Sequence, residues 1–257
     1  MMLDFTLEKY RKLSQSFIQN DYKILTFKSY LKNKDRFESS VILRHDIDRK
    51  PLNALRFAKL ENDLGIKSTY YFRYPDTYNI EIIRKIHDMD HEIGYHYEVL
   101  SKAKGDNDKA IKLFVEELNK FRIEFDINTI CMHGRPLSKY DNRDLWKYFN
   151  FKDFGIIGEA YLSCANDLTY LSDTGRNWGN NNKIRDFIPG YSSVLAANCT
   201  DDLIRIINKK YIKKFYILTH PERWASSNVE WIKSYFQDNI FNIGKFFLPI
   251  FIKNKKK

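Results

Sequence analysis

The chain has 257 residues, 43% of them hydrophobic and 16% aromatic, which suits a single domain with a large core. Its formal net charge of +10 comes from basic residues that alternate with acidic ones, so the charge does not indicate a nucleic-acid-binding protein. The three cysteines include no CxxC pair, and the first residues lack the pattern of a signal peptide. We therefore expect a cytoplasmic protein without disulfides or a structural zinc site.

Short runs rich in β-branched and aromatic residues alternate with amphipathic segments along the chain, which is typical of strand–helix units around a parallel sheet. The predicted strands are 40–47, 67–74, 91–98, 128–134, 154–160, 168–172 and 214–220. The predicted helices are 51–64, 80–89, 108–121, 145–149, 201–208 and one from residue 228 onward. The sequence thus predicts an α/β fold, a single-domain distorted (β/α) barrel with about seven parallel strands.

Three regions are expected. Residues 1–40 are predicted to form a helical segment packed on the barrel, 41–240 the barrel itself, and 241–257 an apolar-basic tail. The apolar run 246–252 is too short to span a membrane, and four lysines follow it. Two interpretations of this tail are open. Either the apolar run packs on the domain and the lysines are solvated, or the tail contacts an anionic membrane surface.

Polar side chains collect where the predicted strands end. Asp46 and Asp48 end the first strand, His96 the third, His133 and Arg135 the fourth and His220 the last. In a barrel of this kind the carboxyl ends of the strands meet on one face, where active sites lie. We therefore expect these side chains to form a site.

The two aspartates are two residues apart, so in a strand they point to the same face while His45 points to the other. This places two carboxylates side by side, one able to bind a metal ion and one able to face the water beside it. The simpler alternative is that Asp48 caps the helix that begins at Pro51.

Asp48 and His96 are a carboxylate and an imidazole, the ligands that zinc takes at catalytic sites. A third ligand is needed, and His133 lies at the correct end of its strand, with Glu98 as the alternative. His133 precedes a glycine, so it could instead make a hydrogen bond within a turn.

Five segments, in order along the chain, resemble the motifs of polysaccharide deacetylases of the NodB and chitin deacetylase type, carbohydrate esterase family four. The segments are RHDID (44–48), DHEIGYHYEVL (90–100), HGRP (133–136), SDTGRNW (172–178) and LTH (218–220). The resemblance implies a NodB-type barrel with these catalytic residues: Asp46 as general base, His220 as general acid, Arg135 orienting Asp46, and Asp173 orienting His220. It also implies Asp48 and His96 as metal ligands.

One position departs from the family pattern. The chain has Leu100 where the family has its second metal-binding histidine. His133 lies two residues before Arg135, and we take it as the replacement ligand.

The resemblance implies a hydrolase of a non-peptide C–N bond that uses a divalent metal ion, zinc in the first instance. Its expected substrate is an N-acetyl (or O-acetyl) group on a sugar or glycan precursor, with Trp178 and Tyr97 contacting the sugar. Without a signal peptide, we expect the enzyme to meet that precursor in the cytoplasm or at the inner face of the membrane. Two alternatives remain: a catalytically inactive glycan-binding module, and a hydrolase of another C–N bond.

Overall fold

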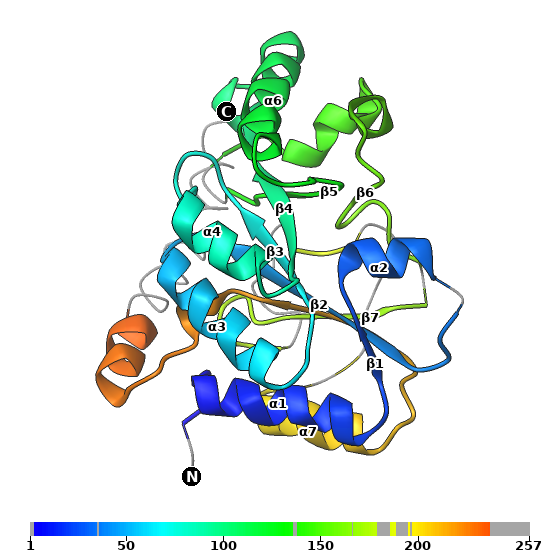
Figure 1. The fold of residues 1–257 in the computed structure, drawn as a ribbon, viewed down its shortest axis with the longest axis vertical. Coiled ribbons are helices and arrows are strands. Elements are labelled where there is room, and N and C mark those ends of the chain that lie inside the picture. Colours follow the sequence, from blue (N-terminus) through cyan, green and yellow to red (C-terminus); the bar gives the residue numbers. More distant parts are fainter. Residues whose placement is uncertain are drawn as a thin grey trace, which may run out of the picture.

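The computed structural model describes residues 3–34, 36–135, 138–165, 167–178, 186–188, 195 and 197–236. All eight strands of the described part belong to one parallel sheet, in the order β6-β5-β4-β3-β2-β8-β7, with β1 pairing to β2 beside this path (Figure 1). The strands are β1 Lys23–Leu25, β2 Ser40–Ile47, β3 Thr69–Phe72, β4 Glu92–Tyr97, β5 Thr129–Met132, β6 Gly158–Glu159, β7 Thr169–Ser172 and β8 Lys214–Thr219. Within these ranges no ladder joins β6 to β7, so the sheet forms an open half-barrel.

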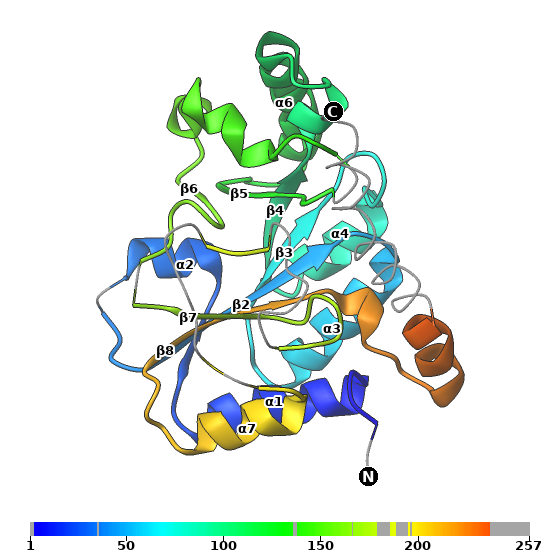
Figure 2. The same cartoon turned by 180° about the vertical axis from the view of Figure 1, so that it is seen from behind.

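Helices separate most of the strands, as the alternating pattern predicts. The α-helices are α1 Leu7–Gln19, α2 Phe27–Lys32, α3 Pro51–Asp63, α4 Ile80–His87, α5 Val99–Lys102, α6 Asn107–Arg122 and α7 Thr200–Asn208. The 3-10 helices are η1 Asn142–Lys147, η2 Phe151–Phe154 and η3 Pro221–Arg223, and residues 228–236 are also helical. Figures 1 and 2 both show α1 beside α7 along one side of the sheet. The predicted fold class is confirmed.

The structure also qualifies the predictions for the two chain ends. Residues 1–40, predicted as a helical segment, contain β1 as well as two helices, because residues 23–25 pair with the start of β2. The apolar-basic tail 241–257 lies outside the described residues. Among the described helices, none is long and apolar enough to cross a membrane.

The central strand β2 decides where the site lies. All eight of its residues are buried, because β8 flanks it on one side and β1 and β3 on the other, and both of its faces are covered. Successive residues alternate between these faces. His45 donates Nε2–H to Glu61 of α3 (2.9 Å) on one face, whereas Asp46 points to the other, as predicted.

A cluster of buried polar side chains connects the outer face of the sheet to its helices by hydrogen bonds. The Glu61 carboxylate is fully buried and accepts hydrogen bonds from four side chains. The donors are Tyr10 (2.5 Å), Ser68 (2.6 Å), Tyr70 (2.6 Å) and His45 (2.9 Å). Since Tyr10 lies in α1 and the other donors lie in or beside β2 and β3, one carboxylate joins two helices to the sheet.

Candidate active site at the carboxyl ends of the strands

Asp48, directly after β2, lies at the centre of the site. Its Oδ1 is 3.3 Å from His96 Nε2 and 3.5 Å from His133 Nε2, and its Oδ2 is 3.9 Å from His220 Nε2. Although Oδ1 is buried, it makes no hydrogen bond with any described residue. The Asp48 side chain does not cap α3, because the N-cap position is Lys50 and has no side-chain cap bond. The capping alternative for Asp48 is therefore wrong.

The three imidazoles around Asp48 are all oriented in the same way. Each donates its Nδ1–H to a neighbouring oxygen: His96 to Cys131 O (3.0 Å), His133 to Glu98 Oε2 (2.9 Å) and His220 to Asp173 Oδ1 (2.6 Å). Carbonyl and carboxylate oxygens can only accept, so the proton must lie on Nδ1 in each ring. In a neutral imidazole the Nε2 lone pair then faces Asp48, which is how metal-binding histidines are held in place.

The charge state of Asp48 also suits a ligand. Burial alone would raise the pKa of Asp48, but the imidazoles of His133 and His96 outweigh it and bring the pKa well below its usual range. The carboxylate is therefore ionised at neutral pH. One ionised carboxylate oxygen without a hydrogen bond and two oriented Nε2 atoms form a donor set that fits zinc or a similar divalent ion.

Asp46 lies one layer deeper and has a different partner. Arg44, two residues earlier on the same face of β2, donates to both of its carboxylate oxygens, from Nε to Oδ1 (2.8 Å) and from Nη2 to Oδ2 (2.6 Å). Burial would raise the pKa of Asp46, but the guanidinium outweighs it and the pKa is lowered. The Asp46 side chain is only 3% exposed, against 22% for Asp48, so Asp48 faces the opening of the site.

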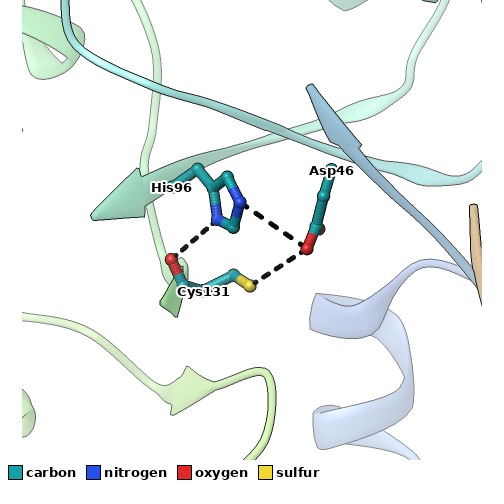
Figure 3. A group of neighbouring side chains, drawn as sticks. All are labelled: Asp46, His96 and Cys131. Carbon is teal, nitrogen blue, oxygen red and sulfur yellow. Dashed lines mark hydrogen bonds and ion pairs between the residues drawn. The ribbon is translucent and has the colours of Figure 1, made fainter. Parts of the chain in front are cut away.

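A second group of ligand-type atoms shares His96. Asp46, His96 and Cys131 bring one such atom each within 4.8 Å of one another, and Figure 3 shows their side chains converging. Arg44 Nη2, however, lies 2.6 Å from both Asp46 Oδ2 and Cys131 Sγ, so a positive charge already occupies this corner. Burial raises the pKa of Cys131 well above its usual value, which keeps it a thiol rather than the thiolate that binds metals. The bound guanidinium and the neutral thiol make the Asp46 group poorly suited to a cation.

Comparison with known proteins gives little beyond the architecture. Neither a protein-family model nor a curated protein matches the chain. Among solved structures, a CE4 family pseudoenzyme from Bacillus anthracis is similar, with 14% sequence identity and a TM-score of 0.44 over 79% of this chain. The match spans 60% of that protein's length. At this distance the likeness leaves the function to be argued from the site itself.

The structure places the predicted general acid and its partner together. Asp173, after β7, accepts the Nδ1–H and the backbone N–H (2.9 Å) of His220, and the indole N–H of Trp224 (2.7 Å). Burial would lower the pKa of His220, and so does the nearby Arg223, but Asp173 outweighs both and raises it to about 9. The imidazole of His220 is therefore protonated at neutral pH, as a proton donor must be.

Arg135 is not the arginine that orients Asp46. The guanidinium bound to both oxygens of Asp46 belongs to Arg44. The Arg135 side chain is 47% exposed and its Nη1 lies 3.6 Å from Glu98 Oε2. The contact with Asp46 that was expected of Arg135 is therefore made by Arg44, because a side chain two residues away on the same strand face reaches the carboxylate directly.

The two predicted sugar-binding aromatics face the core instead. Tyr97 is wholly buried, its hydroxyl accepts from Trp146 Nε1 (2.8 Å), and its ring contacts α6 and η1. Trp178 is also wholly buried, and its indole donates to Thr200 (3.0 Å). A sugar cannot stack on either ring in this structure, so both predictions are wrong.

The motif comparison missed three residues of the site: Arg44, Arg73 and Glu222. Arg44 has a sequence signal, since it shares a strand face with Asp46 and Asp48. Glu222 is buried beyond His220, its carboxylate oxygens accept no hydrogen bond from the described residues, and burial and Asp48 raise its pKa to about 7. Neither Glu222 nor Arg73 follows from motif spacing, because Glu222 reaches the site from η3 and Arg73 from the loop after β3.

Proposed function

We propose that the chain is a metal-dependent deacetylase that hydrolyses an N-acetyl, or O-acetyl, group on a sugar or glycan precursor. The observation that carries the proposal is the convergence of His96 Nε2 and His133 Nε2 on the Asp48 oxygen that has no hydrogen bond, with both Nδ1 atoms bound. These three side chains would hold the ion, and zinc suits their oxygen and nitrogen donors. The ion supplies a Lewis acid that polarises the acyl carbonyl and favours ionisation of water.

The residues on either side of Asp48 carry the proton transfers. Asp46 is ionised and held by Arg44, so it accepts the proton of the attacking water. His220 is protonated and held by Asp173, so it donates a proton to the leaving amine or alcohol. The two groups thus enter the reaction in opposite protonation states, as a base and an acid must.

His133 is the ligand that replaces the missing histidine. Leu100 is buried in α5 and offers no donor atom. His133 comes from the next strand along the sheet and receives its orientation from Glu98, which contacts its Nδ1. Glu98, the alternative ligand in the sequence, acts here as the partner of His133.

One observation favours an inactive, glycan-binding relative instead. Both oxygens of Asp46 are already hydrogen-bonded to Arg44, and the side chain is nearly inaccessible. In an active enzyme Asp46 must still reach a water molecule beside Asp48. A measurement of activity, rather than of metal binding, therefore distinguishes the deacetylase from the inactive glycan-binding relative.

Metal content tests the site directly. Wild-type protein, reconstituted with zinc and dialysed, is expected to hold one zinc per chain by elemental mass spectrometry, and Asp48→Ala and His133→Ala are expected to lose it. The matched control is His87→Ala, since His87 lies on α4 with about half of its side chain exposed. Full zinc content in His133→Ala would show that His133 is not a ligand.

Acetate release tests the reaction. Zinc-loaded wild type is expected to release acetate from an acetylated chito-oligosaccharide, and Asp46→Asn to lose this by roughly 10²- to 10⁴-fold while keeping its zinc. Binding of the oligosaccharide without acetate release would favour the inactive glycan-binding module.

The cytoplasmic location and the membrane contact of the tail remain predictions, best checked by cell fractionation with and without residues 241–257.

A further inference from the structure

Arg73, directly after β3, touches two parts of the site at once. Its Nη1 donates to the backbone carbonyl of Asp48 (3.0 Å), and its Nη2 donates to Glu98 Oε1 (2.8 Å). The other oxygen of Glu98 accepts from His133 Nδ1, and His133 Nε2 faces Asp48 Oδ1 at 3.5 Å. The contacts therefore form a closed ring of four residues from the carboxyl ends of β2, β3, β4 and β5.

We propose that Arg73 and Glu98 form a positioning clamp that sets the distance and orientation between Asp48 and His133, and so allows a histidine from the neighbouring strand to serve as metal ligand. The inference rests on the proposed function, because it assigns the support of the same metal site. Neither residue belongs to the metal ligands themselves.

The ring fixes both members of the ligand pair. On the Asp48 side, the Arg73 guanidinium holds the backbone carbonyl, which restrains the chain at the carboxylate. On the His133 side, Glu98 binds Nδ1, while the His133 backbone N–H donates to Tyr97 O (2.7 Å) and its carbonyl accepts from Asn142 (2.9 Å). With its backbone held at both ends, the remaining freedom of His133 is rotation of its side chain, which Glu98 removes.

Arg73 also fixes the position of Glu98. The Glu98 side chain is 3% exposed, and its two oxygens have separate partners: Oε1 accepts from Arg73 Nη2 (2.8 Å) and Oε2 accepts from His133 Nδ1 (2.9 Å). An arginine suits this position because its planar group donates from two nitrogens to two acceptors at once, which a lysine does not reproduce.

Zinc affinity of the full chain, measured by competition with a chromophoric chelator, tests the clamp. Arg73→Gln is expected to bind zinc roughly 10- to 100-fold more weakly than wild type, as is usual when the partner of a ligating histidine is lost. Arg73→Lys is expected to recover only part of the loss. The control is Arg84→Gln, which removes a guanidinium–carboxylate pair of similar geometry with Glu124 at the exposed surface, and should leave the affinity unchanged.

The ring also predicts how the variants combine. Glu98→Ala is expected to weaken zinc binding by a similar factor, and the double variant with Arg73→Gln by less than the product of the two factors, because part of the effect of Arg73 passes through Glu98. Nitrogen NMR of His133 provides a second readout: Nδ1 carries the proton in the wild type, whereas the variants should show a mixture of tautomers.

Three results would overturn these proposals, and each result has a different consequence. If Arg73→Gln lowers the unfolding midpoint of the metal-free protein but binds zinc within about twofold of wild type, Arg73 is structural only and the clamp is wrong. If the losses in Arg73→Gln and Glu98→Ala multiply, the two residues act separately and the ring is wrong. If wild-type protein binds no divalent ion at all, the proposed function fails together with the clamp.

Discussion

Two aspartates two residues apart can be given different chemistry by their neighbours alone. Asp46 and Asp48 share a strand face and both are ionised, but a guanidinium neutralises the first and imidazoles surround the second. Arg44 is permanently protonated and donates to both oxygens, so it fixes Asp46 in place. Imidazoles can be neutral and offer a lone pair, so a cation can bind between them and the Asp48 carboxylate. The same residue type thus suits proton transfer in one layer and metal binding in the next.

Glu61 allows a pH test of the buried cluster on the opposite face. Burial would raise its pKa, but His45 and its other donors lower it from 4.5 to about 2. A lowered pKa stabilises the folded state above the pKa of the unfolded chain, and this stabilisation, about 3 kcal/mol, is lost as the pH falls from about 5 to about 2. Glu61→Gln is therefore expected to be less stable than wild type by about 3 kcal/mol at pH 7, and the difference should shrink below pH 5.

Urea unfolding at a series of pH values measures this difference. The control is Glu38→Gln, which removes an exposed pair with Lys213 and should leave the free energy of unfolding nearly unchanged at each pH. A constant difference between wild type and Glu61→Gln from pH 7 to pH 3 would show that the charge of Glu61 does not stabilise the cluster.

At the level of elements, the strands and their order in the chain could be predicted because a parallel sheet buries both faces of each strand and leaves continuous apolar runs. That Asp48, His96 and His133 lie close together could be predicted for a related reason: they sit at strand ends, which meet on one face. The predicted sugar contact of Tyr97 was wrong because that prediction did not apply the alternation of side chains along a strand. His96 faces the site, so its neighbour Tyr97 had to face α6.

Other parts of the site lay beyond the sequence because loops decide them. Arg135 follows a strand and has a φ of 31°, a left-handed conformation that periodicity does not reveal. Arg73 reaches the site from the loop after β3, and Glu222 from the short 3-10 helix η3. Side-chain reach from such segments depends on tertiary packing, whereas side-chain direction in a strand follows from position alone.

The strand β4 provides a test of packing between neighbouring elements. Gly94 has no side chain because the ring of Tyr71 from β3 occupies that space: an added Cβ would lie 2.2 Å from Tyr71 Cε1. Tyr71 in turn packs against the guanidinium of Arg44 (5.6 Å), beneath Asp46. Gly94→Ala is expected to cost about 1–3 kcal/mol of stability, since the ring must move within a closed core.

Urea unfolding of Gly94→Ala measures this cost, and Gly65→Ala is the matched control. Gly65 has a φ of +70° but no atom within 4 Å of an added Cβ, so its cost comes from the backbone alone, about 1 kcal/mol. A crystal structure of Gly94→Ala with Tyr71 unmoved would contradict the packing argument.

At the scale of the whole molecule, the N-terminal helix belongs to the same cooperative unit as the barrel. Leu13 and Phe17 of α1 are buried in the common core, and Tyr10 of α1 bonds to Glu61 of α3. The backbone of Leu7 donates to Ala225 (2.9 Å), so the two ends of the described chain are joined. Helix α1 is thus an integral part of the domain and not a separate segment attached to it.

Leu13→Ala tests whether α1 and the barrel unfold together. The change leaves a cavity beneath α1 and is expected to cost about 2–5 kcal/mol, whereas Ile18→Ala on the same helix, 42% exposed, should cost much less. Tryptophan fluorescence would not separate the two, because Trp224 packs against Tyr10 of α1. Pulsed hydrogen exchange at a series of urea concentrations, read by mass spectrometry, follows the strands β4 and β5 separately from α1. If the helix and the barrel form one unit, the unfolding midpoint of these strands falls together with the circular dichroism midpoint. An unchanged midpoint of these strands in Leu13→Ala would mean that α1 detaches while the barrel stays folded.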